Sequence, residues 1–228
     1  MKAQVILSTA GAKHLIAKAL SKYIDFSKKV YIAYGSTNWY LLYHLGIKKD
    51  SYMAGCNVNG CFNVTKTRDK IVFLNSENFE IDSDSYFIKG ANALWYENGK
   101  KQAAVAAADE RGGTYGNFYI KSVIAGAKIV IPVGHEKLIP FFSETSHNVD
   151  FAMGSKIAML RFFAGEVFSE IEAFRVLFNL NAKVILAGGI EDLRGAVGFE
   201  IEGEKVTEAI EFIKKHNSLF IERGEYIF

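Results

Sequence analysis

The stretch that decides the fold is VYIAYGSTNWYLLYHLG, residues 30–46. It begins with β-branched and aromatic residues, which are typical of buried strands, and the run ends at Gly35. Ser36, Thr37 and Asn38 follow, and small polar residues of this kind favour the start of a helix. Residues 39–45 then have the composition of an amphipathic helix, and Gly46 is well suited to end it. A buried strand that leads directly into a helix is the unit of a parallel sheet, so this stretch predicts an α/β fold.

The rest of the first 150 residues repeats this alternation of strands and helices. Ser8 or Thr9 is expected to cap a helix that reaches Tyr23, and a second helix is expected over 114–127. A further helix is expected to start at HEKLIPFF, residues 135–142, whereas the small and polar residues 97–113 are expected to run over the surface. The buried strands are expected at 70–76, 85–94 and 128–134. We therefore predict a three-layer domain with a parallel sheet over residues 1–150.

After residue 150 the pattern changes. The segment 156–169 resembles a strand, a helix follows from Ser169 with a capping box at Glu172, and two strands follow over 182–190 and 195–203. An amphipathic helix over 204–216 and a last strand complete the order β-α-β-β-α-β. That order is the ferredoxin-like unit, so residues 151–228 are predicted to form a second, α+β domain.

Composition excludes several classes of protein. The chain has 228 residues, of which 50% are hydrophobic, and a net charge of +2 from scattered lysines and arginines. Scattered basic residues do not predict a nucleic-acid surface, and no apolar run approaches the roughly 20 residues that cross a bilayer. Lys13, His14 and Lys18 interrupt the apolar residues near the N-terminus, which argues against a signal peptide. We expect a cytoplasmic protein with no nucleic-acid or membrane partner.

The sequence does not predict a metal or a bound cofactor. Cys56 and Cys61 are five residues apart, which fits neither a redox CxxC motif nor the usual zinc spacing. The histidines show no metal-ligand spacing, and no Walker A, GxSxG or GxGxxG motif is present. The expected metal and cofactor content is therefore none.

Three segments are expected to meet at one edge of the parallel sheet, because ligands of such sheets bind beyond the carboxyl ends of the strands. The turn Gly35–Asn38 opens a helix, so its amides and hydroxyls are suited to an anion. Lys89 and Gly90 end a strand, and Gly112, Gly113, Thr114 and Tyr115 open the next helix. Each signal alone is equally compatible with an ordinary cap, strand end or surface turn, and only their shared edge favours a binding site.

These segments carry a resemblance to known families. The helix, the strand and the GSTN turn over residues 8–46 resemble the opening of the superfamily of ribose-5-phosphate isomerase A, glucosamine-6-phosphate deaminase and CoA transferases. SYFIKGANALWYENGK (85–100) and GGTYGNFY (112–119) resemble a block of the related methylthioribose-1-phosphate isomerases. Further elements, including IPVGHEKLIP (131–140), look like an uncharacterised prokaryotic family of this superfamily. The likeness covers roughly residues 8–140, with short motifs.

The resemblance implies a binding site for a phosphorylated or CoA-like metabolite in residues 1–150. It implies that Gly35, Ser36, Thr37, Asn38, Gly90, Gly112, Gly113, Thr114 and Tyr115 bind the ligand. Lys89 would balance its charge and Asn92 would orient a carbonyl or hydroxyl. Asn92 stands where methylthioribose-phosphate isomerases have a catalytic Asp, however, and an amide cannot shuttle a proton as a carboxylate does. Asp109, Glu110 and Glu136 are then the candidates for an acid or base, with Glu110 preferred, although each is also the kind of charge that solvent covers.

Three classes of function stay open at this point. The first is an enzyme of the isomerase or transferase type acting on a small anionic metabolite. The second is a metabolite sensor that has lost the catalytic carboxylates, and the third is a structural protein that assembles through the ferredoxin-like unit. His135 follows the strand 128–134 and is interpreted as a helix-start residue rather than a base. A homodimer is expected in each case.

Overall fold

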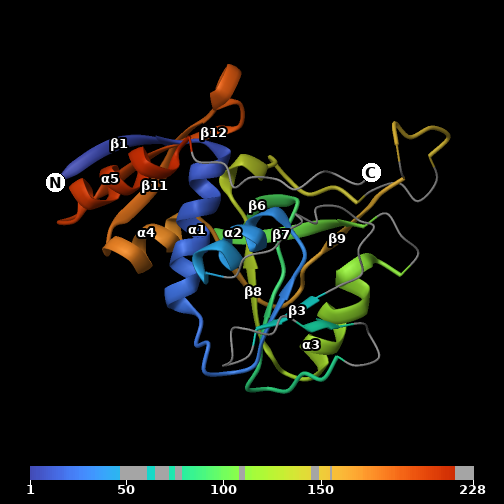
Figure 1. The fold of residues 1–228 in the computed structure, drawn as a ribbon. Helices are drawn as coiled ribbons and strands as arrows, with labels where there is room; N and C mark the ends of the chain where they lie inside the picture. Colours follow the sequence, from blue (N-terminus) through green and yellow to red (C-terminus); the bar gives the residue numbers. More distant parts are fainter. Residues whose placement is uncertain are drawn as a thin grey trace.

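A computed structural model describes residues 1–46, 61–64, 72–74, 79–107, 111–144, 149–154 and 156–218 (Figure 1). The strands are β1 (Lys2–Leu7), β2 (Val30–Ala33), β3 (Cys61–Val64), β4 (Val72–Leu74), β5 (Tyr86–Ile88), β6 (Ala93–Glu97), β7 (Lys100–Ala107), β8 (Lys128–Pro132), β9 (Ala158–Arg161), β10 (Glu166–Phe168), β11 (Asn181–Gly188) and β12 (Ala196–Glu202). The α-helices are α1 (Thr9–Tyr23), α2 (Ser36–His44), α3 (Ile120–Ile124), α4 (Glu170–Phe178) and α5 (Val206–His216). A π-helical turn η1 (Tyr115–Tyr119) precedes α3, and the 3-10 turns are η2 (His135–Lys137) and η3 (Glu191–Leu193).

The largest sheet is mixed, with the order β10-β8-β5-β2-β3-β4. Its first four strands are parallel, whereas β3 and β4 are antiparallel to their neighbours. Alternate residues of β2 enter different cores: Val30 and Ile32 pack with α1 and α2, whereas Tyr31 and Ala33 pack with Phe118 of η1. Two-sided burial is why this strand is continuously hydrophobic. The α/β class predicted from residues 30–46 is confirmed at this level, and its assignment to one particular fold family stays a prediction.

The small residues of the segment 97–113 form a strand, so the expected surface loop is wrong over most of its length. Strand β7 pairs with β6 across the turn Asn98-Gly99, and with β9 on its other side. Ala103, Ala104 and Val105 are buried in this three-stranded sheet. Alanine supplies little β propensity, and here the pairing on both edges outweighs that preference.

The ferredoxin-like arrangement predicted for residues 151–228 is also not the one observed. The expected first strand, 156–169, is divided into β9 and β10, which belong to two different sheets. Gly165, with φ of 114°, turns the chain between them, and a Cβ there would lie 2.7 Å from Ile129. Strand β12 instead pairs antiparallel with β11 and with the N-terminal strand β1, from Lys2 opposite Glu202 to Leu7 opposite Val197.

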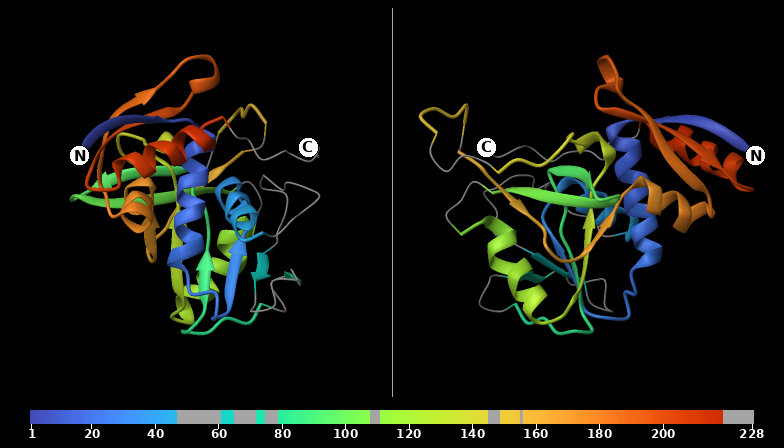
Figure 2. Two further views of the ribbon diagram at one scale, coloured as in Figure 1. Left: turned by 60° about the vertical axis from the view of Figure 1, so that its left-hand side comes forward. Right: turned by 180° about the vertical axis from the view of Figure 1, so that it is seen from behind.

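Helices α4 and α5 lie against this β1-β12-β11 sheet, and α1 connects it to the large sheet (Figure 2). The boundary predicted at residue 150 stays a prediction, although the pairs β7–β9 and β8–β10 join residues on its two sides. The last strand was expected over 218–223, and its residues 219–223 lie outside the described part of the chain.

Helix α1 is held at its start by contacts from the C-terminal helix. Ser8 caps it, because its Oγ accepts a hydrogen bond from the Gly11 amide at 3.0 Å. The Asn217 side chain at the end of α5 accepts from the Ser8 amide at 2.8 Å and donates to the Ile6 carbonyl at 2.9 Å. The expected helix start at Ser8 or Thr9 is confirmed. Among the helices that the structure describes, none has the length and apolarity needed to cross a membrane.

We expect Phe199 of β12 to be a main contributor to stability. Its side chain is fully buried, with its ring centroid 5.6 Å from that of Phe174 and 5.8 Å from that of His135. Phe199→Ala should lower the free energy of unfolding by about 3–5 kcal/mol, since it leaves a cavity between the small sheet and α4. Urea titration followed by circular dichroism measures this, with the exposed Ile190→Ala as a control that should change stability by less than about 0.5 kcal/mol. A loss below about 1 kcal/mol for Phe199→Ala would contradict the packing described.

Candidate functional site

The four parallel strands end together and define a common edge. Strands β2, β5, β8 and β10 end at Ala33, Ile88, Pro132 and Phe168, and we call the edge that follows these residues the carboxyl edge. Ligands of parallel sheets bind at such an edge. Two groups of side chains are found there, one beyond β2 and β5 and the other beyond β8 and β10.

Beyond β2, the predicted turn Gly35–Asn38 forms the start of α2. Gly35 is the N-cap residue and provides no side chain to cap the helix, and a Cβ placed on it would meet no atom within 4 Å. Within the described residues no hydrogen bond reaches the amides of Ser36 and Thr37. Asn38 is 1% exposed, and its Nδ2 donates to the carbonyls of Ala33 at 2.7 Å and Ile88 at 3.2 Å. Asn38 therefore ties the ends of β2 and β5 together and fixes the helix start beside them.

The strand expected over 85–94 is divided into β5 and β6, and Lys89 is buried directly after β5. The Lys137 ammonium donates to the Ala91 carbonyl at 2.7 Å. Gly90 lies beside β8, where a Cβ would be 3.7 Å from the Pro132 carbonyl oxygen. Asn92 is exposed, and its side-chain oxygen accepts from the Ala106 amide at 3.1 Å. This contact gives Asn92 a role in joining β6 to β7, and its proposed part in chemistry stays a prediction.

The third predicted segment makes its contacts elsewhere. Gly112 lies beside Leu160, and the Tyr115 hydroxyl donates to the Arg161 carbonyl at 2.7 Å, so both approach β9. Gly113 accepts at its carbonyl from Asn117, and Thr114 is buried. None of these contacts joins the segment to Gly35 or Lys89. Asp109 and Glu110, proposed as acid or base, lie outside the described residues.

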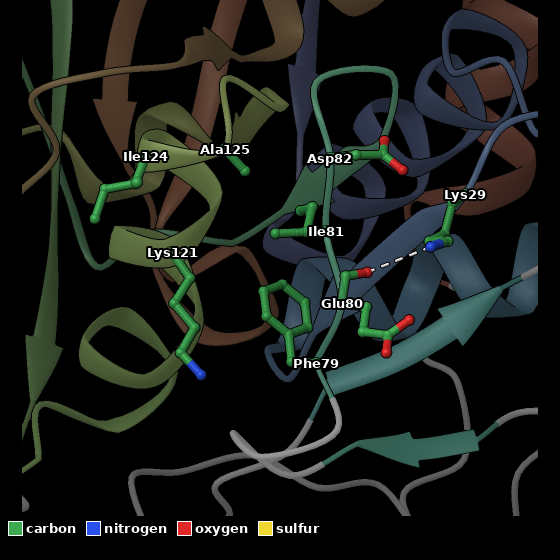
Figure 3. A pocket seen from close by; sticks show the side chains of 8 residues that line it. All are labelled: Lys29, Phe79, Glu80, Ile81, Asp82, Lys121, Ile124 and Ala125. Carbon is green, nitrogen blue, oxygen red and sulfur yellow. Dashed lines mark hydrogen bonds between the residues drawn. The ribbon is translucent and has the colours of Figure 1, made fainter.

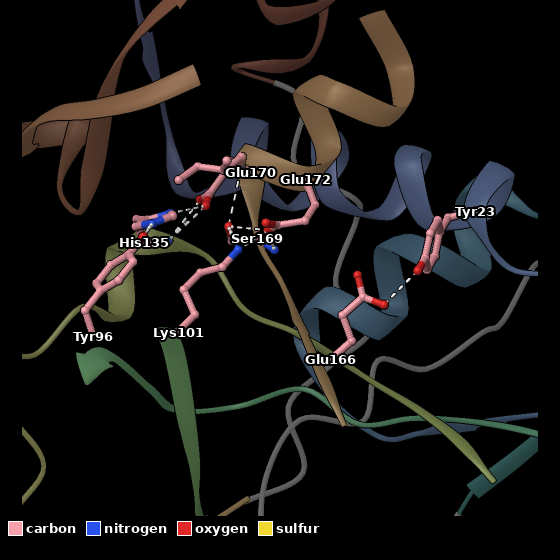
Figure 4. Close-up of polar contacts among 9 residues, drawn as sticks. Tyr23, Tyr96, Lys101, His135, Glu166, Ser169, Glu170 and Glu172 are labelled. Carbon is pink, nitrogen blue, oxygen red and sulfur yellow. Dashed lines mark hydrogen bonds and ion pairs between the residues drawn. The ribbon is translucent and has the colours of Figure 1, made fainter. Parts of the chain in front are cut away.

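The second group at the carboxyl edge is a chain of three side chains from three elements, Glu170, His135 and Tyr96 (Figure 4). The Glu170 carboxylate, fully buried at the start of α4, accepts from the His135 amide at 3.0 Å and lies 2.7 Å from its Nδ1. The His135 Nε2 lies 3.0 Å from the Tyr96 hydroxyl of β6. His135 is 2% exposed and Tyr96 is 45% exposed, so the chain runs from the interior to the surface.

The carboxylate fixes the protonation pattern of this chain. A carboxylate can only accept, so Nδ1 carries the hydrogen of the contact with Glu170, and Nε2 accepts from the Tyr96 hydroxyl. Burial, followed by the negative charges of Glu172 and Glu170, raises the pKa of the Tyr96 phenol. The phenol therefore keeps its proton at rest.

Glu136 places a second carboxyl group beside the first. Burial and then the charge of Glu170 raise the pKa of Glu136, against the smaller opposing effect of Lys137 and Lys13. Its Oε2 is buried without a hydrogen-bond partner among the described residues. A Cβ on Gly134 would lie 1.8 Å from this oxygen and 2.8 Å from Glu170 Oε1, so both carboxyl groups flank the glycine. A like charge this near favours the neutral form of one carboxyl group, and the raised pKa assigns that form to Glu136.

A third polar contact supports the start of α4. Glu172 and Ser169 form the predicted capping box, and the Lys101 ammonium contacts both Ser169 Oγ and the Glu172 carboxylate. Burial acts to raise the pKa of Glu172, but the hydrogen bond and charge of Lys101 outweigh it and the net shift is downward. The helix that holds Glu170 is thus anchored to β7.

Part of this group is predictable from the sequence. His135 and Glu136 were considered because they follow a buried strand, but the helix expected from His135 is only the 3-10 turn η2. Pro140 and the hydrogen bond from the Ile139 amide to the Leu94 carbonyl hold the following residues extended instead. Tyr96 and Glu170 were missed. The signal for Glu170 was its place directly after a strand that ends at this edge.

A groove of about 550 Å³ lies at the opposite edge of the sheet (Figure 3). It is lined by Lys29, Phe79, Glu80, Ile81, Asp82, Lys121, Ile124 and Ala125, which include residues shortly before β2, β5 and β8. The groove lies at the amino ends of the parallel strands, away from the predicted binding residues. Its lining mixes two lysines, two acids and an apolar floor, and does not specify one class of ligand.

A separate cluster of three histidines joins α1, α2 and α5. His14 Nδ1 lies 3.0 Å from His44 Nε2, and the His216 ring centroid is 4.8 Å from that of His14. The sequence separation of these residues gave no sign of this cluster. Among the described residues no group of three or more metal-ligating side chains is placed to hold a metal ion. We interpret the cluster as a buried contact between helices.

Comparison with known proteins adds no relative: no family model, curated protein or solved structure matches the chain. The resemblance to the isomerase and CoA transferase superfamily therefore stays a prediction from the sequence.

The histidine cluster predicts a loss of stability in acid. Burial, followed by the charges of His14, Lys18 and His216, lowers the pKa of His44 to about 3. The folded state thus binds the proton less well than the unfolded chain, whose His titrates near 6.5, and stability is lost as the pH falls from about 6.5 toward 3. The folding equilibrium constant should fall by at most about tenfold per pH unit from this group, less any screening by solvent. Urea titrations at pH 7, 6 and 5 should show a shallower loss for His44→Asn, and an equal loss in both proteins would contradict the assignment.

Proposed function

We propose that this protein binds a small anionic metabolite at the carboxyl edge, with a phosphate or carboxylate of the ligand placed at the start of α2. The observation that carries the proposal is the glycine-capped start of this helix beside the end of β5, where a Cβ on Gly35 would meet no atom of the described residues within 4 Å. Helix amides without an internal acceptor form a site for an anion, since the helix dipole adds to their hydrogen bonds.

The neighbouring groups support an anion rather than a neutral ligand. Helix α2 has no acidic residue in its first turn, and Lys89 is buried at the end of the adjacent strand. The Asn38 Oδ1 is buried without a hydrogen-bond partner among the described residues, so it can accept from a hydroxyl of the ligand. A phosphorylated compound with hydroxyl groups, such as a sugar phosphate, matches both features.

We favour an enzyme over a metabolite sensor, because the same edge carries the Glu170–His135–Tyr96 chain. A sensor needs binding groups alone, whereas buried acid and base groups are arranged for proton transfer. The resemblance noted in the sequence suggests chemistry of the isomerase or transferase type. The cytoplasmic location and the homodimer are part of the same proposal.

The test is a thermal-shift screen with inorganic phosphate, sugar phosphates, nucleotides and CoA esters. A ligand at 100 times its dissociation constant should add about 2.7 kcal/mol to the stability of the folded protein. Ser36→Asp should abolish that gain, because the new carboxylate occupies the helix start, and should itself leave the protein at least as stable. Binding is thereby separated from folding.

Asn181→Asp is the matched control, since it adds the same charge on the exposed strand β11, and it should retain the shift. If no member of the panel stabilises the native protein, or if Ser36→Asp binds as well as the native chain, the proposed site is wrong.

A further inference from the structure

We propose that Tyr96 is a reactive group of this protein, a base and nucleophile whose proton is taken by His135 and whose activation depends on Glu170. It would serve a carbonyl compound or another small molecule with an acidic C–H or O–H bond. The identity of the ligand that reaches Tyr96 rests on the proposed function. The hydrogen bonds among Tyr96, His135 and Glu170 do not depend on it.

The direction of the hydrogen bonds determines what Tyr96 presents to a ligand. Nδ1 of His135 is 2.7 Å from Glu170, so the hydrogen on that ring is committed to the carboxylate. The Tyr96 hydrogen then lies between its oxygen and Nε2, which are 3.0 Å apart. The phenol oxygen keeps lone pairs that this hydrogen bond does not use, on a residue that is 45% exposed. A group that presents lone pairs accepts a proton or attacks an electrophile.

The step balances without another reactant. As the ligand gives its proton to the phenol oxygen, the phenolic proton passes to Nε2 of His135. The ring becomes an imidazolium between Tyr96 and Glu170, and the ligand becomes an anion. In the reverse step the imidazolium returns its proton through Tyr96 to the product. Glu170 stabilises the imidazolium and orients the ring, so His135 and Glu170 are positioning residues for Tyr96.

The charged groups around the chain are consistent with this direction. The carboxylates of Glu170 and Glu172 of α4 favour a cation on the ring, whereas Lys101 of β7 is paired with Glu172. Because the phenol keeps its proton at rest, Tyr96 gains reactivity from the neighbouring base and not from a resting tyrosinate.

Tyr23 is a matched internal control, drawn with Tyr96 in Figure 4. It is 43% exposed, and its hydroxyl donates to the Glu166 carboxylate at 2.7 Å. That hydrogen bond, followed by burial, raises the pKa of Tyr23 to about 12. The two tyrosines thus have similar exposure and one acceptor each, but the acceptor is imidazole in one and a carboxylate, a much weaker base, in the other.

The experiment measures the labelling of tyrosines in the full chain by benzenesulfonyl fluoride at pH 7.5, with peptide mass spectrometry. In this reaction the phenol oxygen bonds to sulfur, fluoride leaves, and the phenolic proton goes to the neighbouring base. Tyr96 should be labelled at least tenfold faster than Tyr23. In Glu170→Gln and His135→Gln, the labelling rate of Tyr96 should fall to that of Tyr23. The labelling rate of Tyr23 should stay unchanged.

Labelling of Tyr96 no faster than Tyr23 in the native protein would overturn the proposal, and this comparison needs no variant to fold. A native rate for Tyr96 in folded Glu170→Gln would also overturn the role of Glu170. The reagent carries no phosphate, so the outcome is separate from that of the anion screen. Rapid labelling of Tyr96 in a protein that binds no anion would support the reactivity of Tyr96 and contradict only the proposed anionic ligand.

Discussion

The buried Glu170 carboxylate and the His135 ring together join elements of all three described sheets at the carboxyl edge. The carboxylate lies at the first position of α4, directly after β10, and accepts both the amide and the ring hydrogen of His135 after β8. The His135 ring then contacts Phe199 of the small sheet and Tyr96 of the hairpin β6–β7. Residues of all three sheets of the described structure therefore lie around the contact between Glu170 and His135. Removing the carboxylate would leave buried donors unpaired, which generally costs about 1–3 kcal/mol.

The same contact explains why the two halves of the carboxyl edge differ. Beyond β2 and β5, Asn38 joins the strand ends through neutral hydrogen bonds, and the start of α2 has no side-chain cap among the described residues. Beyond β8 and β10, the start of α4 is closed by its own capping box, and the charged groups there are side chains of the protein itself. One half is thus suited to receive negative charge from outside, and the other to move a proton. The proposed enzyme uses both, with the anion fixing the ligand and the Tyr96 chain acting on it.

Local pattern was enough to predict the elements whose neighbours are close in sequence. The hydrophobic run of β2, the turn to α2, the strand 128–134 and the capping box at Ser169 all follow from a few adjacent residues. Pairings between distant residues were not predictable in this way. Lys2 pairs with Glu202, and this pairing replaces the ferredoxin-like unit with a sheet that includes the N-terminal strand. The chain of Tyr96, His135 and Glu170 joins residues 39 and 35 positions apart, and single side chains at such separations leave no periodic signal.

The central claim is that Glu170 holds His135 in one tautomer, with the hydrogen on Nδ1 and the lone pair of Nε2 turned to Tyr96. Long-range ¹H–¹⁵N correlation spectra of the histidine rings test it directly at neutral pH, with Tyr96→Phe used to assign the His135 signals. We expect a protonated Nδ1, an unprotonated Nε2, and a change confined mainly to Nε2 when the Tyr96 hydroxyl is removed. A ring protonated on Nε2 alone, or one that does not respond to that change, would contradict it.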